Sequence, residues 1–378
     1  MFSLKSYSKE ELLLKITCLA WLAGKIITWK VWISDRLFPI IPVLDCFPEF
    51  SNTFHSILFA FSLLGLMLIF LFPEKKYLFG FFFFIEIFSC LLDQMRWQPW
   101  EYQYMLLFLF FIFYKKNTSQ FLELLTFMLA FTYILSGIHK FNGGFLHNIW
   151  RGMILHRFFH FDKNLLSNTY IHYSGLILAF IEFALGIGLL LLRKKKIIAL
   201  LAIAMHLFLL LLLGPLGINY NPSVWPWNLA LILFLVVLFW NSNEINISYS
   251  FLKNKFNFAV FILIGVMPCL GLMGFWDGFL SFKVYPGNSK LLVLYTKNID
   301  AYPELAIYKS KKKFLKKKDG ATVNLGSVVM RELKVAIYSE ERIYVKIKRE
   351  WDEKFPEQKN EFYICEYPFK SDNIKKIP

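Results

Sequence analysis

Lys140 is the residue best placed to do chemistry in this sequence. It ends a long apolar segment that starts at Phe121, and Gly143-Gly144 follow just beyond it. If this segment is a helix, Tyr133, Ser136 and Lys140 share one face, because residues three, four and seven apart stack above one another. An amine at the edge of an apolar layer is poorly solvated and holds its proton less firmly, so it can act as a general base. The spacing therefore indicates a site with two hydroxyl groups and an amine.

A second interpretation needs no chemistry at this position. A lysine at the end of a membrane helix extends its amine to the polar interface, and Trp and Tyr gather at the same level in membrane proteins. His139, which precedes Lys140, points away from the face that carries Lys140. Composition and spacing alone favour this second interpretation.

Unusual polar and aromatic residues also gather between the apolar runs, most densely in the stretch DQMRWQPWEYQY at 93–104. If these segments converge on Lys140, they form a polar pocket with aromatic walls. Such a pocket suits an amphipathic ligand with a planar head and an apolar tail, such as a quinone or an aromatic lipid. The residues that we assign to this pocket, besides Lys140, are Asp93, Arg96, Trp97, Trp100, Tyr133, His139, His206 and Asn219.

Ionisable side chains within apolar runs are costly and indicate a functional role by default. Lys25 has Trp21 and Trp29 at a spacing of four, so a cation–π contact is a sufficient explanation. Glu182 and His206 are as well explained by polar contacts that join two helices, worth about 1 kcal/mol each. Glu86 shares a helical face with Asp93, which in turn is three residues from Arg96 and so placed to pair with it.

The composition defines the class of protein. The chain of 378 residues is 57% hydrophobic and 19% aromatic but only 18% charged, whereas soluble domains are about one quarter charged. The five cysteines are scattered and predict neither a disulfide framework nor a metal site. We find no GxSxG, Walker or HExxH motif, and we expect no metal and no nucleic-acid partner. These features predict an all-α polytopic membrane protein embedded in a lipid bilayer.

Apolar runs long enough to cross a membrane recur about nine times. Lysine and arginine gather in every second connection, at 75–76, 115–116, 193–196 and 253–255, which places these connections and the N-terminus in the cytoplasm. The remaining connections and the C-terminus then lie on the outer face, as expected for a bacterial inner-membrane protein. The nine expected spans are 12–33, 54–72, 77–93, 101–114, 119–140, 169–192, 196–213, 225–240 and 257–276.

A change of composition near Phe282 predicts a boundary between a transmembrane domain (1–282) and a small α/β domain (283–378) on the outer face. The second part holds half of the 42 Lys and Arg residues. Segments 291–296 and 361–367 are expected to be strands, and Ser339-Glu340-Glu341 is expected to begin a helix. The lysine-rich run 309–318 is interpreted as a solvated hairpin tip rather than as an anionic-lipid patch.

Segment 145–159 differs from the expected spans. Its apolar residues recur at helical spacing, and His147, Arg151, His156 and Arg157 fall largely between them. This pattern predicts a helix that lies in the outer membrane interface rather than crossing the bilayer.

Four stretches together resemble the HTTM family of membrane proteins, which includes the vitamin K-dependent γ-glutamyl carboxylases. The likeness covers most of residues 10–280. Lys140 matches the carboxylases' catalytic base, His139 matches the preceding basic position, and His172, His206 and Gly217 fall at matching positions. The resemblance implies a quinol cofactor such as menaquinol or vitamin K hydroquinone, with Lys140 as general base. The four stretches are LLDQMRWQPWEYQYMLL, YILSGIHKFNGGFLHNIWRGM, HYSGLILAFIE and MHLFLLLLLGPLGINY.

Two departures limit what this resemblance implies. A histidine that supports the chemistry in the carboxylases is matched by Trp100, and the large extracytoplasmic portion that docks their protein substrate has no counterpart in 283–378. We therefore do not carry γ-carboxylation over to this chain. Two hypotheses remain: an enzyme that acts on a quinol-like or lipid-like molecule at the outer face, and a non-catalytic membrane partner or assembly factor whose C-terminal domain docks another protein.

Overall fold

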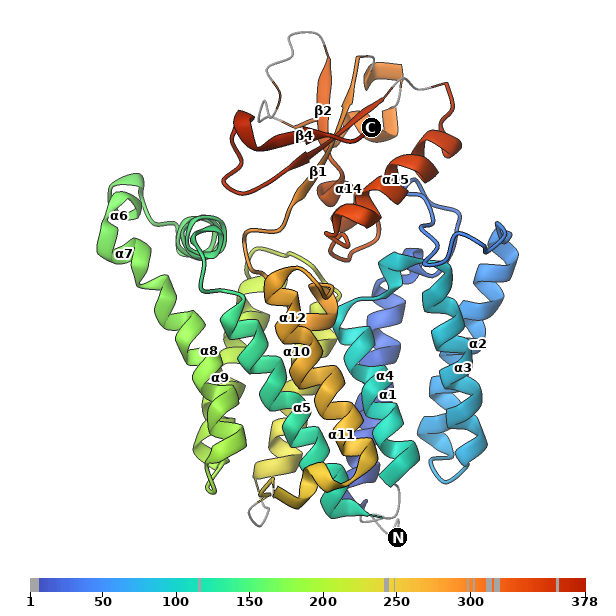
Figure 1. Cartoon of the computed structure of the whole chain (residues 1–378), viewed down its shortest axis with the longest axis vertical. Coiled ribbons are helices and arrows are strands. Elements are labelled where there is room, and N and C mark those ends of the chain that lie inside the picture. The colour runs from blue at the N-terminus through green and yellow to red at the C-terminus, as the bar shows by residue number, and fades with distance from the viewer. Residues whose placement is uncertain are drawn as a thin grey trace.

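The computed structural model consists of a bundle of long helices with a small α/β layer at one end (Figure 1). It describes residues 7–114, 117–240, 245–247, 249–297, 299–301, 303–310, 315, 320–357 and 360–378. We refer to residues 283–378 as the cap and to the nearer end of the helices as the cap end. The long helices are α1 (Lys9–Ile27), α2 (Asn52–Leu71), α3 (Lys76–Leu92), α4 (Pro99–Tyr114), α5 (Thr118–Ile138), α8 (Gly175–Leu191), α9 (Lys196–Leu213) and α10 (Val224–Phe239).

All nine apolar segments expected to be spans are helical. The last one is a continuous run of α11 (Lys255–Phe261), a π-helical turn, α12 (Met267–Leu270) and a 3₁₀ turn. Five helical stretches are long and apolar enough to cross a membrane: 52–71, 118–138, 169–191, 196–213 and 255–273. Helices α3, α4 and α10 are shorter, with 17, 16 and 16 residues, and α1 is rich in Lys and Glu. The length and apolar composition of these five helices identify the chain as a membrane protein.

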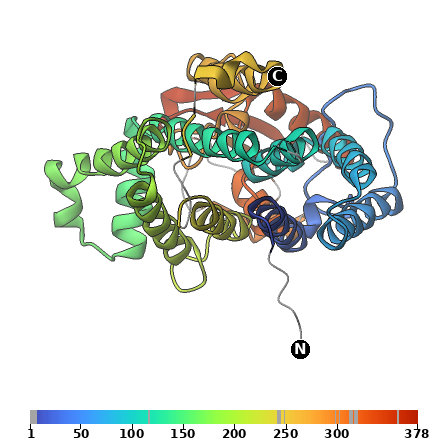
Figure 2. The same ribbon diagram turned by 90° about the horizontal axis from the view of Figure 1, so that it is seen from below.

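Helix α5 runs through the centre of the bundle, with other helices on both sides of it (Figure 2). Within its apolar window 83% of the residues are buried, against 28–33% for the other four candidate spans. Asn117 begins α5 by accepting a hydrogen bond from the backbone of Gln120 at 3.2 Å, as an N-cap residue does. Because α5 is central, its final residues reach the middle of the cap end rather than its edge.

The segment after α5 turns across the bundle. A π-helix, η3 (Phe145–Phe158), is seen end-on beside α6 (Lys163–Ser167) in Figure 1, whereas the bundle helices run vertically there. The prediction of a helix over 145–159 is confirmed, although its turns are wider than the α-helical spacing assumed. Trp150 of η3 donates a hydrogen bond to the carbonyl of Ile171 at 2.7 Å, which ties the crosswise helix to α7 (Thr169–Tyr173).

The cap is built on a four-stranded antiparallel sheet in the order β2-β1-β3-β4. The predicted strand 291–296 is confirmed as β1 (Leu291–Thr296), whereas the second ends two residues early as β3 (Glu361–Cys365). The helix expected after residue 339 is α15, and its apolar face is buried, but Glu340 rather than Ser339 precedes it, without a side-chain cap. Of the run 309–318, only 309, 310 and 315 lie within the described residues. The other elements are β2 (Ala321–Asn324), β4 (Ile374–Lys376), α14 (Leu325–Glu332) and α15 (Glu341–Lys354).

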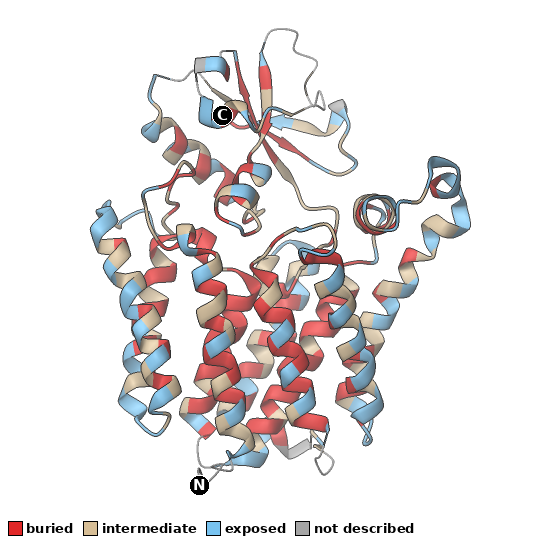
Figure 3. Cartoon of the chain, turned by 180° about the vertical axis from the view of Figure 1, so that it is seen from behind, coloured by how far each residue is buried: buried red, intermediate tan, exposed pale blue. Residues whose placement is uncertain are grey.

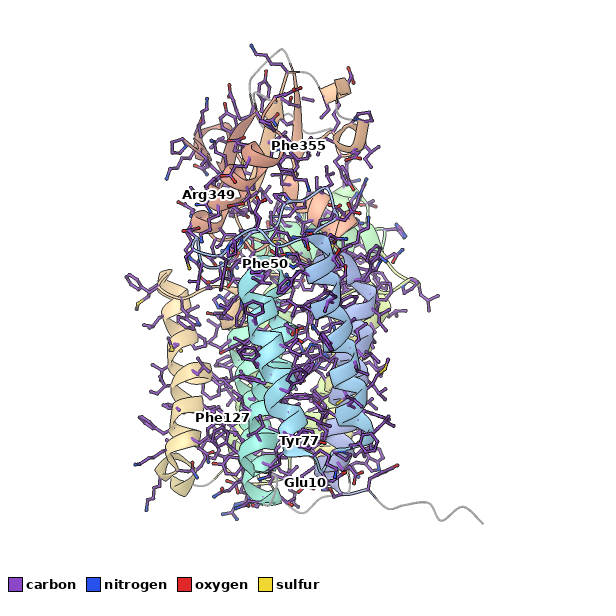
Figure 4. The ribbon with its side chains drawn as sticks, turned by 90° about the vertical axis from the view of Figure 1, so that its right-hand side faces the viewer. Glu10, Phe50, Tyr77, Phe127, Arg349 and Phe355 are labelled. Carbon is purple, nitrogen blue, oxygen red and sulfur yellow. The ribbon has the colours of Figure 1, made fainter. Side chains whose placement is uncertain are left out.

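The cap is held firmly on the helices, and buried residues continue from one into the other (Figure 3). The Glu332 carboxylate accepts hydrogen bonds from the backbone amides of Leu37 at 2.5 Å and Phe38 at 3.0 Å. Arg349 of α15 forms an ion pair with Asp45 at 2.8 Å, and Figure 4 shows it above the helices on the side of Phe50. The loop between α1 and α2 thus lies between the cap and the bundle and is bound by side chains of the cap.

Candidate functional site

A largely apolar cavity lies inside the bundle at the cap end, between α5, η3, α8, α9 and α10. Its volume is about 130 Å³. Apolar side chains such as Met153, Leu178 and Leu209 form most of its wall. A narrow apolar space with a few convergent polar groups is the usual form of a small-molecule site. The polar residues on the wall include Tyr133, Ser136, Lys140, Glu182, His206 and Asn228.

The first polar group in this cavity is an ion pair that joins α5 to α8. The Lys140 amine lies 2.7 Å from a carboxylate oxygen of Glu182, and both side chains are only 11–13% exposed. The amine also donates to the hydroxyl of Ser136 at 2.6 Å and to its carbonyl at 3.2 Å. An ammonium group has three hydrogens, and each has an acceptor here. In this arrangement the Lys140 amine is held in place by Ser136 and Glu182.

The second polar group is a chain of hydrogen bonds from α5 through α9 to α10. Asn228 donates its amide hydrogen to the carbonyl of Val224 at 2.7 Å, so its oxygen faces the Nδ1 of His206 at 2.8 Å. That pairing places the imidazole hydrogen on Nδ1 and leaves Nε2 as an acceptor. The hydroxyl of Tyr133 then donates to Nε2 at 2.7 Å. Both ring nitrogens of His206 therefore have a partner, and its position is fixed from both sides.

Glycines bring α5 and α8 close enough for the ion pair. A Cβ on Gly137 would lie 2.6 Å from the backbone nitrogen of Phe183, and one on Gly186 would lie 2.5 Å from the carbonyl oxygen of Ala130. Small residues at such crossings are the usual way in which membrane helices approach each other. The seam between α5 and α8 is the most extensive helix contact in the protein, and it sets the distance between Lys140 and Glu182.

Asp93 and Arg96 lie outside this cavity, in a buried network between the α1–α2 loop and the α3–α4 connection. Asp93 pairs with Arg36 at 2.6 Å, so the suggested pairing with Arg96 is wrong. The Arg96 guanidinium donates instead to the carbonyls of Val31 and Ser89, at 3.1 and 2.9 Å, and burial lowers its pKa to about 10. Sequence reasoning missed Arg36, because nothing local distinguishes a partner 57 positions away.

The remaining predicted pocket residues are also separated from Lys140. Trp100 is buried against Gly24 of α1, at 3.4 Å from the position of a Cβ there. Trp97 is half-buried beside the same core, Asn219 is exposed in the loop between α9 and α10, and His139 is buried directly after the end of α5. None of these four lines the cavity. The structure thus brings together Lys140, Tyr133 and His206, adds Glu182, Ser136 and Asn228, and leaves Asp93, Arg96, Trp97, Trp100, His139 and Asn219 elsewhere.

The sequence contained some indication of the cavity residues that were not assigned to the predicted site. Glu182 is recognisable in the sequence as an ionisable residue in an apolar run. Its partner, Lys140, becomes apparent only when α8 packs against α5. Asn228 is a lone amide in the apolar sequence WNLALIL, where an unpaired amide would be costly, so it also signals a partner. Comparisons of the chain with protein-family models, with curated proteins and with solved structures found no match.

Proposed function

We propose that this protein is a multi-pass membrane protein of the HTTM type that binds a quinol-like or lipid-like molecule in the cavity at the cap end. In this proposal all nine helical segments cross the bilayer, the N-terminus is cytoplasmic and the cap lies on the outer face. The lysine-rich turn before α3 supports this orientation, because it lies at the end of the helices opposite the cap; Tyr77 marks it in Figure 4.

One observation carries the proposed ligand class: a single apolar cavity contains two separate polar groups, Lys140–Glu182 and Tyr133–His206–Asn228. Apolar walls suit a hydrocarbon or ring system, and the polar groups suit a head with hydroxyl or carbonyl oxygens. Ile181, which lines the cavity, is also 42% exposed on the outer surface of α8. An apolar molecule dissolved in the bilayer therefore has a short route to this space.

In the enzymatic form of the proposal, Lys140 acts as general base. Burying an ion pair costs desolvation energy that the attraction between the charges only partly offsets, so a ligand that excludes water favours the neutral pair of amine and carboxylic acid. Glu182 then holds the proton, and the amine removes a proton from a hydroxyl group of the ligand. The products of that step are the ammonium and the ligand oxyanion. Tyr133 and His206 would position the ligand without changing charge.

The test measures binding of menaquinol and of vitamin K hydroquinone to the purified full-length protein in lipid nanodiscs. Lys140→Ala is expected to weaken binding at least about tenfold, which corresponds to about 1.4 kcal/mol. Lys163→Ala is the matched control, because Lys163 is exposed on α6. Equal affinity of the wild type, Lys140→Ala and Tyr133→Phe would refute the site, and unchanged quinol consumption by Lys140→Ala would refute the role as base.

A further inference from the structure

A second group of charged side chains lies in the other half of the bundle, apart from the cavity of Lys140. It is made by Lys25 of α1, Glu86 of α3 and Glu101 of α4, and all three side chains are completely buried. The Lys25 amine forms an ion pair with Glu86 and lies 3.9 Å from Glu101. The spacing suggested aromatic contacts with Trp21 and Trp29; the contact with Trp21 is present, at 5.9 Å from the ring centre, but the second contact is with Trp32, at 3.1 Å.

Three of the four carboxylate oxygens in this group have hydrogen-bond donors. One oxygen of Glu86 accepts from Lys25, and the other accepts from the hydroxyl of Ser62 at 2.7 Å. One oxygen of Glu101 accepts from the indole nitrogen of Trp21 at 2.7 Å. The other oxygen of Glu101, Oε1, has no hydrogen-bond partner among the described residues, although it is fully buried. A buried polar atom without a partner indicates that something is missing from its surroundings.

The charges in this group do not balance. Two ionised glutamates and one ammonium give a net charge of −1, with no exposed surface through which water could screen it. An isolated charge in such a place is so costly that the group changes its protonation state instead. The carboxylate oxygens of Glu86 and Glu101 lie within 4.8 Å of each other and of the Cys90 sulfur, so the two acids repel unless one is neutral.

We propose that Glu86 and Glu101 form a buried proton-binding site that holds one proton, carried on Oε1 of Glu101. The proton neutralises the excess charge and gives the unpartnered oxygen a hydrogen to donate toward Glu86. The ammonium of Lys25 pairs with Glu86 and lies 3.9 Å from Glu101, so it already supplies a positive charge to the two carboxylates that a metal ion here would need. This assignment is independent of the cavity at Lys140, and it places one bound proton in the α1–α3–α4 half of the bundle.

Among the described residues that face this cluster, the Arg96 cation interacts with Glu86 through space and contacts the same Trp32 ring as Lys25, but it forms no hydrogen bond or ion pair with either glutamate. Arg96, from the α3–α4 connection, directs its guanidinium to Ser89, to His55 of α2 and to backbone carbonyls. Tyr104, one turn beyond Glu101, is buried with its hydroxyl unpartnered among the described residues. The thiol of Cys90 is buried and neutral. A proton is therefore the smallest ligand that completes the site.

The test is infrared spectroscopy of the full-length protein in nanodiscs at mildly alkaline pH, where exposed carboxyl groups are ionised. The wild type is expected to show the carbonyl band of a protonated carboxylic acid, and Glu101→Gln is expected to lose it while remaining folded, because glutamine is a neutral replacement of the same shape. Glu86→Gln should lose the band as well, since the single remaining acid then ionises against Lys25.

Lys25→Met provides the opposite change, because both acids then become neutral and the band should double. If a variant does not fold, alkaline titration of the wild type alone decides: the absence of any acid band would overturn the proposal. An acid band that persists in Glu101→Gln would overturn it too. So would a stoichiometric metal ion that is bound by the wild type and absent from Glu101→Gln.

Discussion

The seam between α5 and α8 gives the sharpest prediction about stability. Replacing Gly186 by alanine adds a Cβ 2.5 Å from the carbonyl oxygen of Ala130 and 2.8 Å from the backbone nitrogen of Ile134. Ordinary contact begins near 3.4 Å, so the new methyl group is 0.9 Å too close to a backbone atom. Neither atom belongs to a flexible side chain. Helix α8 must therefore move away from α5 or rotate against it.

The expected cost follows from packing. Overfilling a close-packed contact typically costs about 1–3 kcal/mol. Alanine also favours a helix over glycine by about 1 kcal/mol, which works in the other direction. Gly80→Ala on α3 isolates the packing effect, because no atom of the described residues lies within 4 Å of the added Cβ there and the gain in helix propensity is the same. Gly186→Ala is therefore expected to be about 1–3 kcal/mol less stable than Gly80→Ala.

The assay is equilibrium unfolding of both purified variants in the same lipid–detergent mixture. The affinity for menaquinol provides a second measurement, because a shift of α8 lengthens the distance between Lys140 and Glu182. Gly186→Ala should lose affinity, whereas Gly80→Ala should keep it. Equal stability of the two variants would refute the close approach of α5 and α8, and with it the geometry of the ion pair.

Two further predictions concern the attachment of the cap. Glu332→Gln replaces one of the two oxygens that accept backbone amides of the α1–α2 loop, so it should cost about 1–3 kcal/mol and speed proteolysis in that loop. Hydrogen bonds from Arg349 and then Lys346 hold the pKa of the Asp45 carboxyl below its usual value. Because that pKa is lowered in the folded state, its stabilising effect is present above the unfolded pKa and is lost as the pH falls through the folded value. The protection of α15 amides against hydrogen exchange, relative to their intrinsic exchange rate at each pH, should therefore fall in acid, and Asp45→Asn should remove this pH dependence.

The sequence allowed the helical segments and much of the cap to be predicted, because both depend on local patterns. Apolar runs between lysine-rich turns located the nine helical segments, and a short run of mainly apolar residues located β1. The partners of the charged residues could not be predicted in the same way. Asp93 pairs with Arg36 rather than with Arg96, which is three residues away, because the α1–α2 loop folds back over α3. Such a contact depends on the path of a loop, which no periodicity encodes.

The site residues that lie on one helix could be predicted from the sequence, but the residues that other helices contribute could not. Tyr133, Ser136 and Lys140 share a face of α5 by spacing alone, and all three line the cavity. The expectation that the loop at 93–104 meets Lys140 assumed that polar residues at one end of a bundle converge. In the structure, the α3–α4 connection is instead bound to the segment after α1, through Asp93 with Arg36 and through Arg96 with the carbonyls of Val31 and Trp32.

The half-exposed position of Ile181 has a consequence for the route by which the proposed ligand would enter the cavity. Helices α8 and α9 have their wide apolar surfaces turned outward, so a ligand that enters beside Ile181 arrives sideways from the hydrocarbon and never passes the cap. Occupancy then depends on how strongly the molecule partitions into the bilayer rather than on its concentration in water. Diluting the same amount of ligand with more lipid should empty the cavity, whereas adding water should leave it filled.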